Sequence, residues 1–370
     1  MKGPVASRAP VVVQIVPTAP GGVRDFADCL KAEWEQRQVA SHVIALDRSD
    51  ARAVALHERL AALQESDSAP VSILLHFSGY GYERRALCFW LLKELRAARR
   101  VLGPRLRVVT MIHELYASGS PWQSAFWIGG VQAHVTRSMA RLSDALWTNT
   151  SYHGDWLGAT VKRSTPVRVR PVFSTVGEPN VNRPLEDRGH GLVVFGSRTT
   201  RQRALARVEA CTRQLLALGV DRLIEVGDGP ASVAPPTGLP YEHVGRLDER
   251  AIGALLQQHR FALIDYPPLY IGKSTVFAAY ASHGCLVLNT DSTSAAAEGL
   301  QPGRHYLVLG EGGPVVDPGD HEVVAWSATE WYQGHRMSLQ ASEFLEWLGV
   351  LPLHRSEVGR VGLETSEATT

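Results

Sequence analysis

The sequence has little of several features that would define a class of protein at once. The formal net charge is only +1, from 38 basic and 37 acidic residues, so composition gives no electrostatic case for a nucleic-acid partner. The four cysteines are scattered, and no pair has the spacing of a metal site. We therefore expect reduced thiols in a cytoplasmic protein that holds no metal or cofactor. No apolar run approaches the roughly 20 residues that span a bilayer.

What the sequence does have is an alternation of short apolar runs with amphipathic segments. Apolar content is 45% over 370 residues, enough for about two globular domains. Strands alternating with helices imply parallel sheets with right-handed crossovers. We predict an α/β protein with two Rossmann-like lobes that face each other across a cleft. The predicted parts are an N-terminal lobe (1–172), a Pro- and Gly-rich linker (173–191), a second lobe (192–325), C-terminal helices (326–350) and a disordered tail (351–370).

A His-Glu pair follows the most apolar strand of the first half. Residues 107–112 read as a central parallel strand, and His113 and Glu114 come directly after it. Ligands of open α/β sheets bind beyond the carboxyl ends of the strands, which favours a functional role over a buried structural histidine. An imidazole there can serve as a hydrogen-bond partner or a general base. A zinc-protease helix is excluded because Ala117 stands where its second histidine would be.

Two glycine-containing loops follow other strands of the first half. Gly21 and Gly22 lie between a strand and a helix, where they either form a plain turn or let backbone N–H groups approach an anion. Residues 78–84 resemble a dinucleotide fingerprint, but Arg84 replaces its third glycine, which argues against NAD. We expect this second loop to line the cleft, with tyrosines that either stack on a sugar or simply pack.

The second half contains an arginine-rich loop at the start of a helix. Residues 196–203 carry three arginines, and cations at a helix start oppose the helix dipole. A bound phosphate would explain them, and a solvated surface is the alternative. We select Arg198, which lies inside the loop with Gly196 and Ser197, as the best candidate of the three to bind a phosphate.

A second candidate for phosphate binding is the segment Gly272, Lys273, Ser274 and Thr275. The glycine frees the backbone, the lysine supplies charge, and Ser274 can cap the following helix while neighbouring N–H groups face an anion. A P-loop is disfavoured because Pro267 occupies the position of its first glycine. An ordinary capped helix with a surface lysine is the alternative to a diphosphate site.

With these residues placed, the chain resembles the GT-B glycosyltransferases, and most closely their retaining family 4. The resemblance covers most of residues 11–350 and is stronger in the order of motifs than in identity. It rests on the Gly21-Gly22 loop, the strand ending in His113 and Glu114, and segments 146–151, 193–198, 225–230 and 279–287. One departure is that the two glutamates of family 4, eight positions apart, are replaced here by Ile271 and Ala279.

The resemblance implies transfer of a sugar from a nucleoside diphosphate to the hydroxyl of a glycan or small-molecule acceptor. It implies that the first lobe binds the acceptor, that the second lobe binds the nucleotide-sugar donor against residues 196–199 and 273–275, and that the C-terminal helices can cross back to the first lobe. Arg198 and Lys273 would neutralise the leaving diphosphate without a metal, and His113 with Glu114 would hold and orient the sugar or acceptor. Two alternatives stay open, a two-lobed nucleotide-sugar epimerase and a non-catalytic protein that binds sugar nucleotides. The first would need more carboxylates in the cleft than the sequence places there.

One helix has the composition of a membrane-surface element. Residues 84–100 are basic on one side and apolar on the other, so the helix could rest on an anionic membrane. We favour the alternative that its apolar stripe faces the core, as such stripes usually do.

Overall fold

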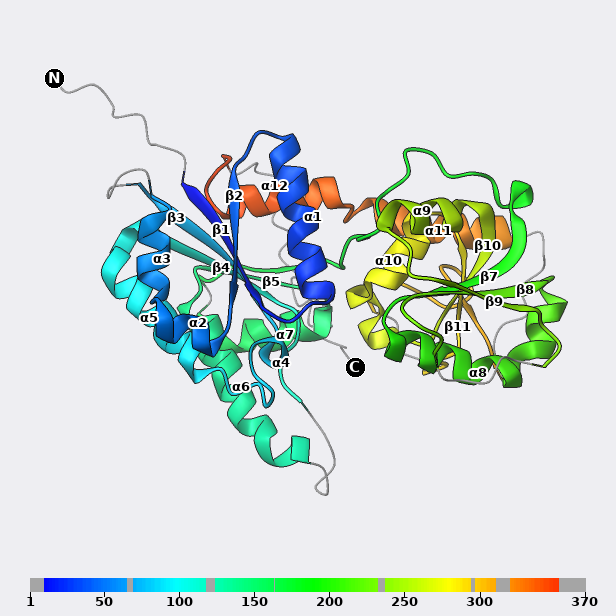
Figure 1. Cartoon of the computed structure of the whole chain (residues 1–370), viewed down its shortest axis with the longest axis horizontal. Helices are drawn as coiled ribbons and strands as arrows, with labels where there is room; N and C mark the ends of the chain where they lie inside the picture. Colours follow the sequence, from blue (N-terminus) through cyan, green and yellow to red (C-terminus); the bar gives the residue numbers. More distant parts are fainter. Residues whose placement is uncertain are drawn as a thin grey trace, which may run out of the picture.

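The computed structural model describes residues 10–64, 69–117, 124–162, 164–231, 237–293, 297–310 and 320–352. In this part of the chain two parallel six-stranded sheets lie side by side, each with helices on both faces (Figure 1). The first sheet has the order β2-β1-β3-β4-β5-β6 and the second the order β12-β11-β10-β7-β8-β9. This arrangement confirms the predicted α/β architecture of two Rossmann-like lobes.

The elements of the first lobe alternate between strand and helix. Its strands are β1 (Val11–Pro17), β2 (Ser41–Leu46), β3 (Val71–Phe77), β4 (Leu106–Ile112), β5 (Ala145–Thr148) and β6 (Val167–Val169). Its helices are α1 (Gly22–Gln36), α2 (Arg48–Ala53), α3 (Leu56–Ala62), α4 (Gly79–Tyr82), α5 (Phe89–Leu102), α6 (Ser124–Leu142) and α7 (Ser151–Thr160). The central strands β3 and β4 are almost entirely buried, as continuous apolar runs require.

The second lobe repeats the plan. Its strands are β7 (Gly189–Phe195), β8 (Arg222–Val226), β9 (Tyr241–Gly245), β10 (His259–Ile264), β11 (Leu286–Asn289) and β12 (Leu307–Val308). Its helices are α8 (Arg198–Ala217), α9 (Glu249–Gln258), the 3₁₀ segment η3 (Pro268–Lys273), α10 (Thr275–Ser282) and α11 (His321–Gln333). β7 begins inside the stretch predicted as linker, and the predicted tail lies almost wholly outside the described residues.

The last helix, α12 (Met337–Trp347), returns to the first lobe and packs beside α1 (Figure 1). The indole of Trp34 donates to the carbonyl of Ala341 at 3.0 Å, and the ring of Phe344 stacks on Trp147 with centroids 4.2 Å apart. The predicted crossing is therefore made by α12. The preceding helix α11 stays on the second lobe, where Trp331 donates to the carbonyl of Glu298, so Trp331 is not part of the crossing.

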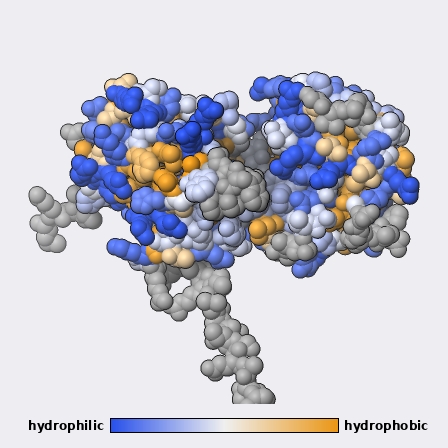
Figure 2. Space-filling view, turned by 90° about the horizontal axis from the view of Figure 1, so that it is seen from below, coloured by the Kyte–Doolittle hydropathy of each residue, from blue (hydrophilic) through white to orange (hydrophobic). Residues whose placement is uncertain are grey.

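Helix α5 buries the apolar stripe that raised the question of a membrane surface. Leu91, Leu92, Leu95 and Ala98 are 0–2% exposed and pack in the core of the first lobe, which confirms the core-facing interpretation. Among the described residues, no helix combines the length and apolarity that crossing a bilayer demands. Hydrophilic residues are spread over both lobes on the face seen in Figure 2.

Candidate functional site

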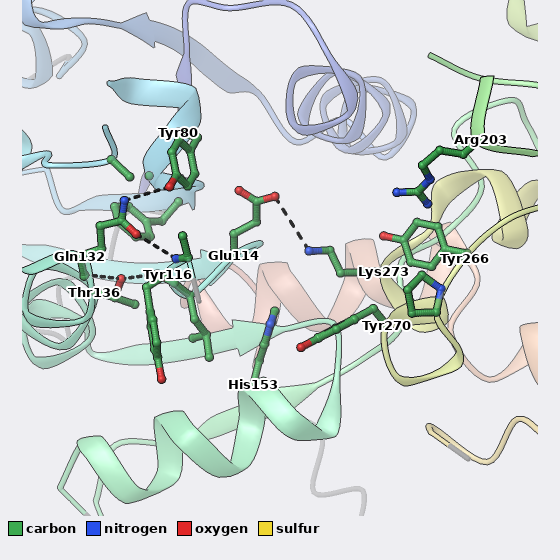
Figure 3. A pocket seen from close by; sticks show the side chains of 16 residues that line it. Tyr80, Glu114, Tyr116, Gln132, Thr136, His153, Arg203, Tyr266, Tyr270 and Lys273 are labelled. Carbon is green, nitrogen blue, oxygen red and sulfur yellow. Dashed lines mark hydrogen bonds and ion pairs between the residues drawn. The ribbon is translucent and has the colours of Figure 1, made fainter. Parts of the chain in front are cut away.

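The site lies where the carboxyl ends of the two sheets face each other. A smaller cavity of about 200 Å³ and a larger one of about 360 Å³ lie between residues of the first and the second lobe. The smaller cavity brings together five of the predicted residues: Gly22, His113, Glu114, Lys273 and Thr275. Glu114 and Lys273 also line the larger cavity, so this pair lies where the two meet (Figure 3).

Lys273 and Glu114 point toward one another from opposite lobes (Figure 3). The Lys273 ammonium lies 3.9 Å from the Glu114 carboxylate, which also accepts a hydrogen bond from the Ser78 hydroxyl at 3.0 Å. Burial lowers the pKa of Lys273, and the nearby Glu114 carboxylate opposes that shift. A partly desolvated cation beside an open cavity gains strongly from an anionic ligand, because its own water shell is already incomplete.

His113 follows β4 and is held from behind by a second histidine. Its Nε2 lies 3.3 Å from Nδ1 of His76, which is fully buried near the end of β3. Burial and the charge of Lys273 lower the pKa of His113 to about 3. The imidazole is therefore neutral at physiological pH, which favours a hydrogen-bonding role over that of a general base.

The glycine loop after β1 borders the smaller cavity. Gly21 has φ +144°, which favours glycine, and a Cβ at either Gly21 or Gly22 would meet nothing within 4 Å. The first turn of α1 therefore has open space beside it. Gly22 lines the cavity, whereas Gly21 lies one residue before the helix and does not.

The segment after β10 forms the opposite wall. Ser274 caps α10, because its hydroxyl accepts from the backbone N–H of Phe277 at 3.1 Å, and Thr275 begins the helix. The Gly272 carbonyl accepts from Val172 N at 2.8 Å, so Gly272 contacts the first lobe directly. A Cβ there would lie 3.1 Å from a carboxylate oxygen of Glu298 and 3.2 Å from the carbonyl oxygen of Asn149 in the first lobe, so close packing between the lobes explains the glycine.

The three arginines of residues 196–203 have different surroundings. Arg201 is buried and pairs with the equally buried Glu225. Arg203 lines the larger cavity, donates to the carbonyl of Asp265 at 2.6 Å and lies 5.8 Å from the ring centroid of Tyr266. Arg198, the residue selected from the sequence, is exposed at the start of α8 and lines neither cavity. Its neighbours Gly196 and Ser197, the latter being the cap of α8, also line neither cavity.

Asn149 is a site residue that the sequence interpretation missed. It lines the smaller cavity directly after β5 and is only 1% exposed. Among the described residues, neither the amide oxygen nor the amide nitrogen has a hydrogen-bond partner. A buried amide without partners is unfavourable by about 1–3 kcal/mol, so a polar ligand in this cavity would satisfy it. Its position at the carboxyl end of a strand was the available signal.

The larger cavity has an aromatic and polar lining. Four tyrosines, Tyr80, Tyr116, Tyr266 and Tyr270, lie around it together with Gln132 and His153. Tyr80 comes from the loop expected to line the cleft, and Gln132 donates to its hydroxyl at 3.0 Å. Aromatic faces and hydroxyl groups of this kind suit the apolar faces and hydroxyls of a sugar. Among the described residues that line either cavity, Glu114 alone is a carboxylate.

In the described part of the chain, no group of three or more His, Cys, Asp and Glu side chains is arranged to hold a metal ion. The four cysteines form no disulfide.

Comparison with known proteins adds information about the fold. No known family matches the sequence, and no curated protein sequence matches it. Solved structures do match. An α-glucosyltransferase (AGT) in complex with UDP is 10% identical, with a TM-score of 0.57 over 92% of this chain and 100% of that one. The same enzyme has been solved with UDP and DNA containing an HMU base.

Two further enzymes have the same architecture. The pneumococcal O-GlcNAc transferase GtfA, in complex with UDP and GlcNAc, is 9% identical, with a TM-score of 0.54 over 94% of this chain and 100% of that one. An α,α-trehalose 6-phosphate synthase from Burkholderia multivorans is 11% identical, with a TM-score of 0.54 over 92% and 98%. The chain therefore has the GT-B fold of nucleotide-sugar glycosyltransferases, at identities that establish the fold alone.

Proposed function

We propose that this protein transfers a sugar from a nucleoside-diphosphate sugar to the hydroxyl group of an acceptor. The observation that carries the proposal is the meeting of His113 and Glu114 of the first lobe with Lys273 and Thr275 of the second around one cavity. Three structural neighbours with the same fold are glycosyltransferases, and two of them were solved with UDP. The lining of the cavity and the fold of these neighbours both agree with the resemblance found in the sequence.

The donor diphosphate is proposed to bind at the start of α10. Lys273 would neutralise its charge, and the first-turn N–H groups of the helix would bind its oxygens. Gly22 faces the same cavity from the first lobe, where the open space at α1 leaves room for the transferred sugar. We propose that the protein supplies this charge without a metal. Activity should then persist in EDTA, and its loss on chelation would contradict this part of the proposal.

The link to retaining family 4 is proposed on the order of motifs alone. The positions of its two glutamates hold Ile271 and Ala279, which are 1% and 0% exposed in the core and are not available to a ligand. The ribose and sugar hydroxyls must therefore be bound by other groups, and Asn149 is positioned to be one. Nuclear magnetic resonance of the freshly formed product would show whether the anomeric configuration is retained.

The acceptor is proposed to occupy the larger cavity. This cavity adjoins the smaller one at Glu114 and Lys273 and offers tyrosine rings and polar groups, which suit a glycan or a small hydroxyl compound. One neighbour was solved with DNA. The formal net charge of +1 gives no electrostatic support for a nucleic-acid acceptor.

Calorimetric titration with UDP and GDP tests the donor site. Wild-type protein should bind one of them, and Lys273→Ala should bind it at least about tenfold more weakly, since a charge-assisted hydrogen bond contributes about 1.5–3 kcal/mol. Lys93→Ala, an exposed lysine on α5, should bind like wild type. Equal binding by Lys273→Ala would overturn the assignment. Radiolabelled donor then separates a transferase, which releases or transfers sugar, from a protein that only binds it.

A further inference from the structure

Three polar side chains form a chain of hydrogen bonds that leads from α1 to His113. Nε2 of His113 lies 3.3 Å from Nδ1 of His76, and Nε2 of His76 lies 2.9 Å from Oε1 of Gln14. Nε2 of Gln14 donates to the carbonyl oxygen of Ala27 at 3.0 Å. Gln14 on β1 and His76 on β3 are 0% exposed, so these contacts are the partners of two fully buried polar groups.

The carbonyl of Ala27 fixes the direction of every bond in this chain. A carbonyl oxygen only accepts, so the Gln14 atom that faces it must be the NH₂ group. The amide oxygen of Gln14 then faces His76 and requires a proton on Nε2 of that ring. The reverse orientation of Gln14 would place two oxygens against each other at Ala27.

The protonation of His76 determines which nitrogen of His113 is protonated. Burial, and next the proximity of His113, keep the pKa of His76 well below its usual value, so the ring is neutral and carries one proton. With that proton on Nε2, Nδ1 of His76 is a bare acceptor, and Nε2 of His113 must donate to it. His113 is also neutral, so its Nδ1 carries no proton. Among the described residues, that Nδ1 has no hydrogen-bond partner.

We infer that Gln14 and His76 are positioning residues that hold His113 in the tautomer protonated on Nε2, so that Nδ1 offers a lone pair to a hydroxyl group of the substrate. The identity of that ligand as a sugar rests on the proposed function, whereas the tautomer does not. His113 thus selects a group that donates a hydrogen bond. A deoxyfluoro sugar, whose fluorine cannot donate, loses this bond.

Aromatic contacts hold the ring of His113 in place, while the hydrogen bonds through His76 and Gln14 determine which of its nitrogens is protonated. Phe26 of α1 lies edge-on to both His76 and His113, with ring centroids 5.8 and 5.7 Å away. The charged groups near the outer side of His113 are Lys273 and Glu114, which line the same cavity. Lys273 opposes a second proton on the ring, so the lone pair stays available over the physiological range of pH.

The test is to record the imidazole resonances of the full-length, nitrogen-15-labelled protein without ligand at neutral pH, with His113 assigned from the spectrum of His113→Asn. We expect an unprotonated, pyridine-type Nδ1 and a protonated, pyrrole-type Nε2. A protonated Nδ1 in wild type would overturn the inference, and the only variant that this result requires is a folded His113→Asn protein for the assignment.

Two variants of Gln14 separate hydrogen-bond direction from packing. Gln14→Leu removes the anchor, and the two nitrogen resonances of His113 should move toward each other as the tautomers exchange. A protonated Gln14→Glu side chain can still donate to Ala27 and accept from His76, so it should preserve the wild-type signals. An unchanged spectrum in a folded Gln14→Leu protein would contradict the relay. UDP-glucose is then added to wild type, and failure to perturb His113 counts against the proposed function but leaves the tautomer result standing.

Discussion

Asn149 and Asn289 lie at the carboxyl ends of strands in opposite lobes and are equally buried, at 1% and 0% exposed, yet within the described residues only the side chain of Asn289 has hydrogen-bond partners. The amide of Asn289 accepts from the backbone N–H of Tyr266 at 3.0 Å and donates to its carbonyl at 2.8 Å. The two asparagines thus have the same burial but different roles. Asn289 fixes the loop after β10, whereas the amide of Asn149 borders the smaller cavity, where a polar ligand would supply the missing partners.

The first prediction follows from this pair. Asn149→Leu removes a buried amide without partners and should leave the free energy of unfolding unchanged or raise it by about 1 kcal/mol, while nucleotide-sugar binding falls. Asn289→Leu should instead lower the free energy of unfolding by about 1–3 kcal/mol, because the backbone groups of Tyr266 lose their partner. Urea unfolding and calorimetry measure both. Destabilisation by Asn149→Leu equal to that by Asn289→Leu would show that Asn149 is structural.

The second prediction concerns pH. Because burial lowers the pKa of Lys273, its positive charge is lost at a lower pH than that of an ordinary lysine. Diphosphate binding should therefore weaken with rising pH before the ordinary lysine pKa of 10.5 is reached. Glu114→Gln removes the carboxylate that raises this pKa, so the decline should begin at a still lower pH. Lys273→Arg keeps its charge, and a matching decline in that variant would assign the pH effect to another group.

The third prediction separates the arginines of the α8 region. Arg201→Ala leaves the buried carboxylate of Glu225 without its cation and should destabilise the protein by about 3–5 kcal/mol. Arg203→Ala should leave the unfolding free energy within about 1 kcal/mol of wild type, because its ion pair with Asp265 is partly exposed, and should instead weaken ligand binding. Denaturant unfolding with parallel binding assays distinguishes the two. Weaker binding by Arg198→Ala would restore the original assignment of that residue.

The fourth prediction tests the attachment of α12 to the first lobe. Phe344 is 0% exposed and stacks on Trp147, so Phe344→Ala should lower the unfolding free energy by about 3–5 kcal/mol. Leu339 lies on the same helix but is 48% exposed, and Leu339→Ala serves as the control with an expected change below about 1 kcal/mol. Similar losses in both variants would mean that helix propensity, not packing, decides the outcome.

Much of the fold could be predicted because its strongest signals are local. β3 and β4 are continuous apolar runs, and α1 repeats its buried side chains at Phe26, Leu30 and Trp34, four residues apart. β9 was not predicted, since its sequence Tyr-Glu-His-Val-Gly is half polar and only partly buried. β12 has only two residues and is specified by pairing with β11. The two short helices α2 and α3 are separated only by Val54 and Ala55, a break that the local sequence does not signal.

Part of the site was predictable from residues that follow a strand or precede the start of a helix. His113 and Glu114 follow β4, Lys273 precedes α10, and the structure places all three around one cavity. Gln14 and His76 lie inside apolar strands, where the sequence does not show which polar side chains will meet. Their relation depends on parallel pairing of β1 with β3, which brings together residues 62 positions apart. The distinction between Arg198 and Arg203 likewise depends on which side of the α8 turn faces the first lobe.

The return of α12 means that the polypeptide joins the two lobes at two separate points, once between β6 and β7 and again between α11 and α12. A body tethered at one point can swivel about three axes, whereas one tethered at two points turns about the line that joins them. A rotation of one lobe against the other would thereby be restricted to a hinge about that line. Such a restriction would favour a constant position of the Lys273 ammonium opposite Glu114.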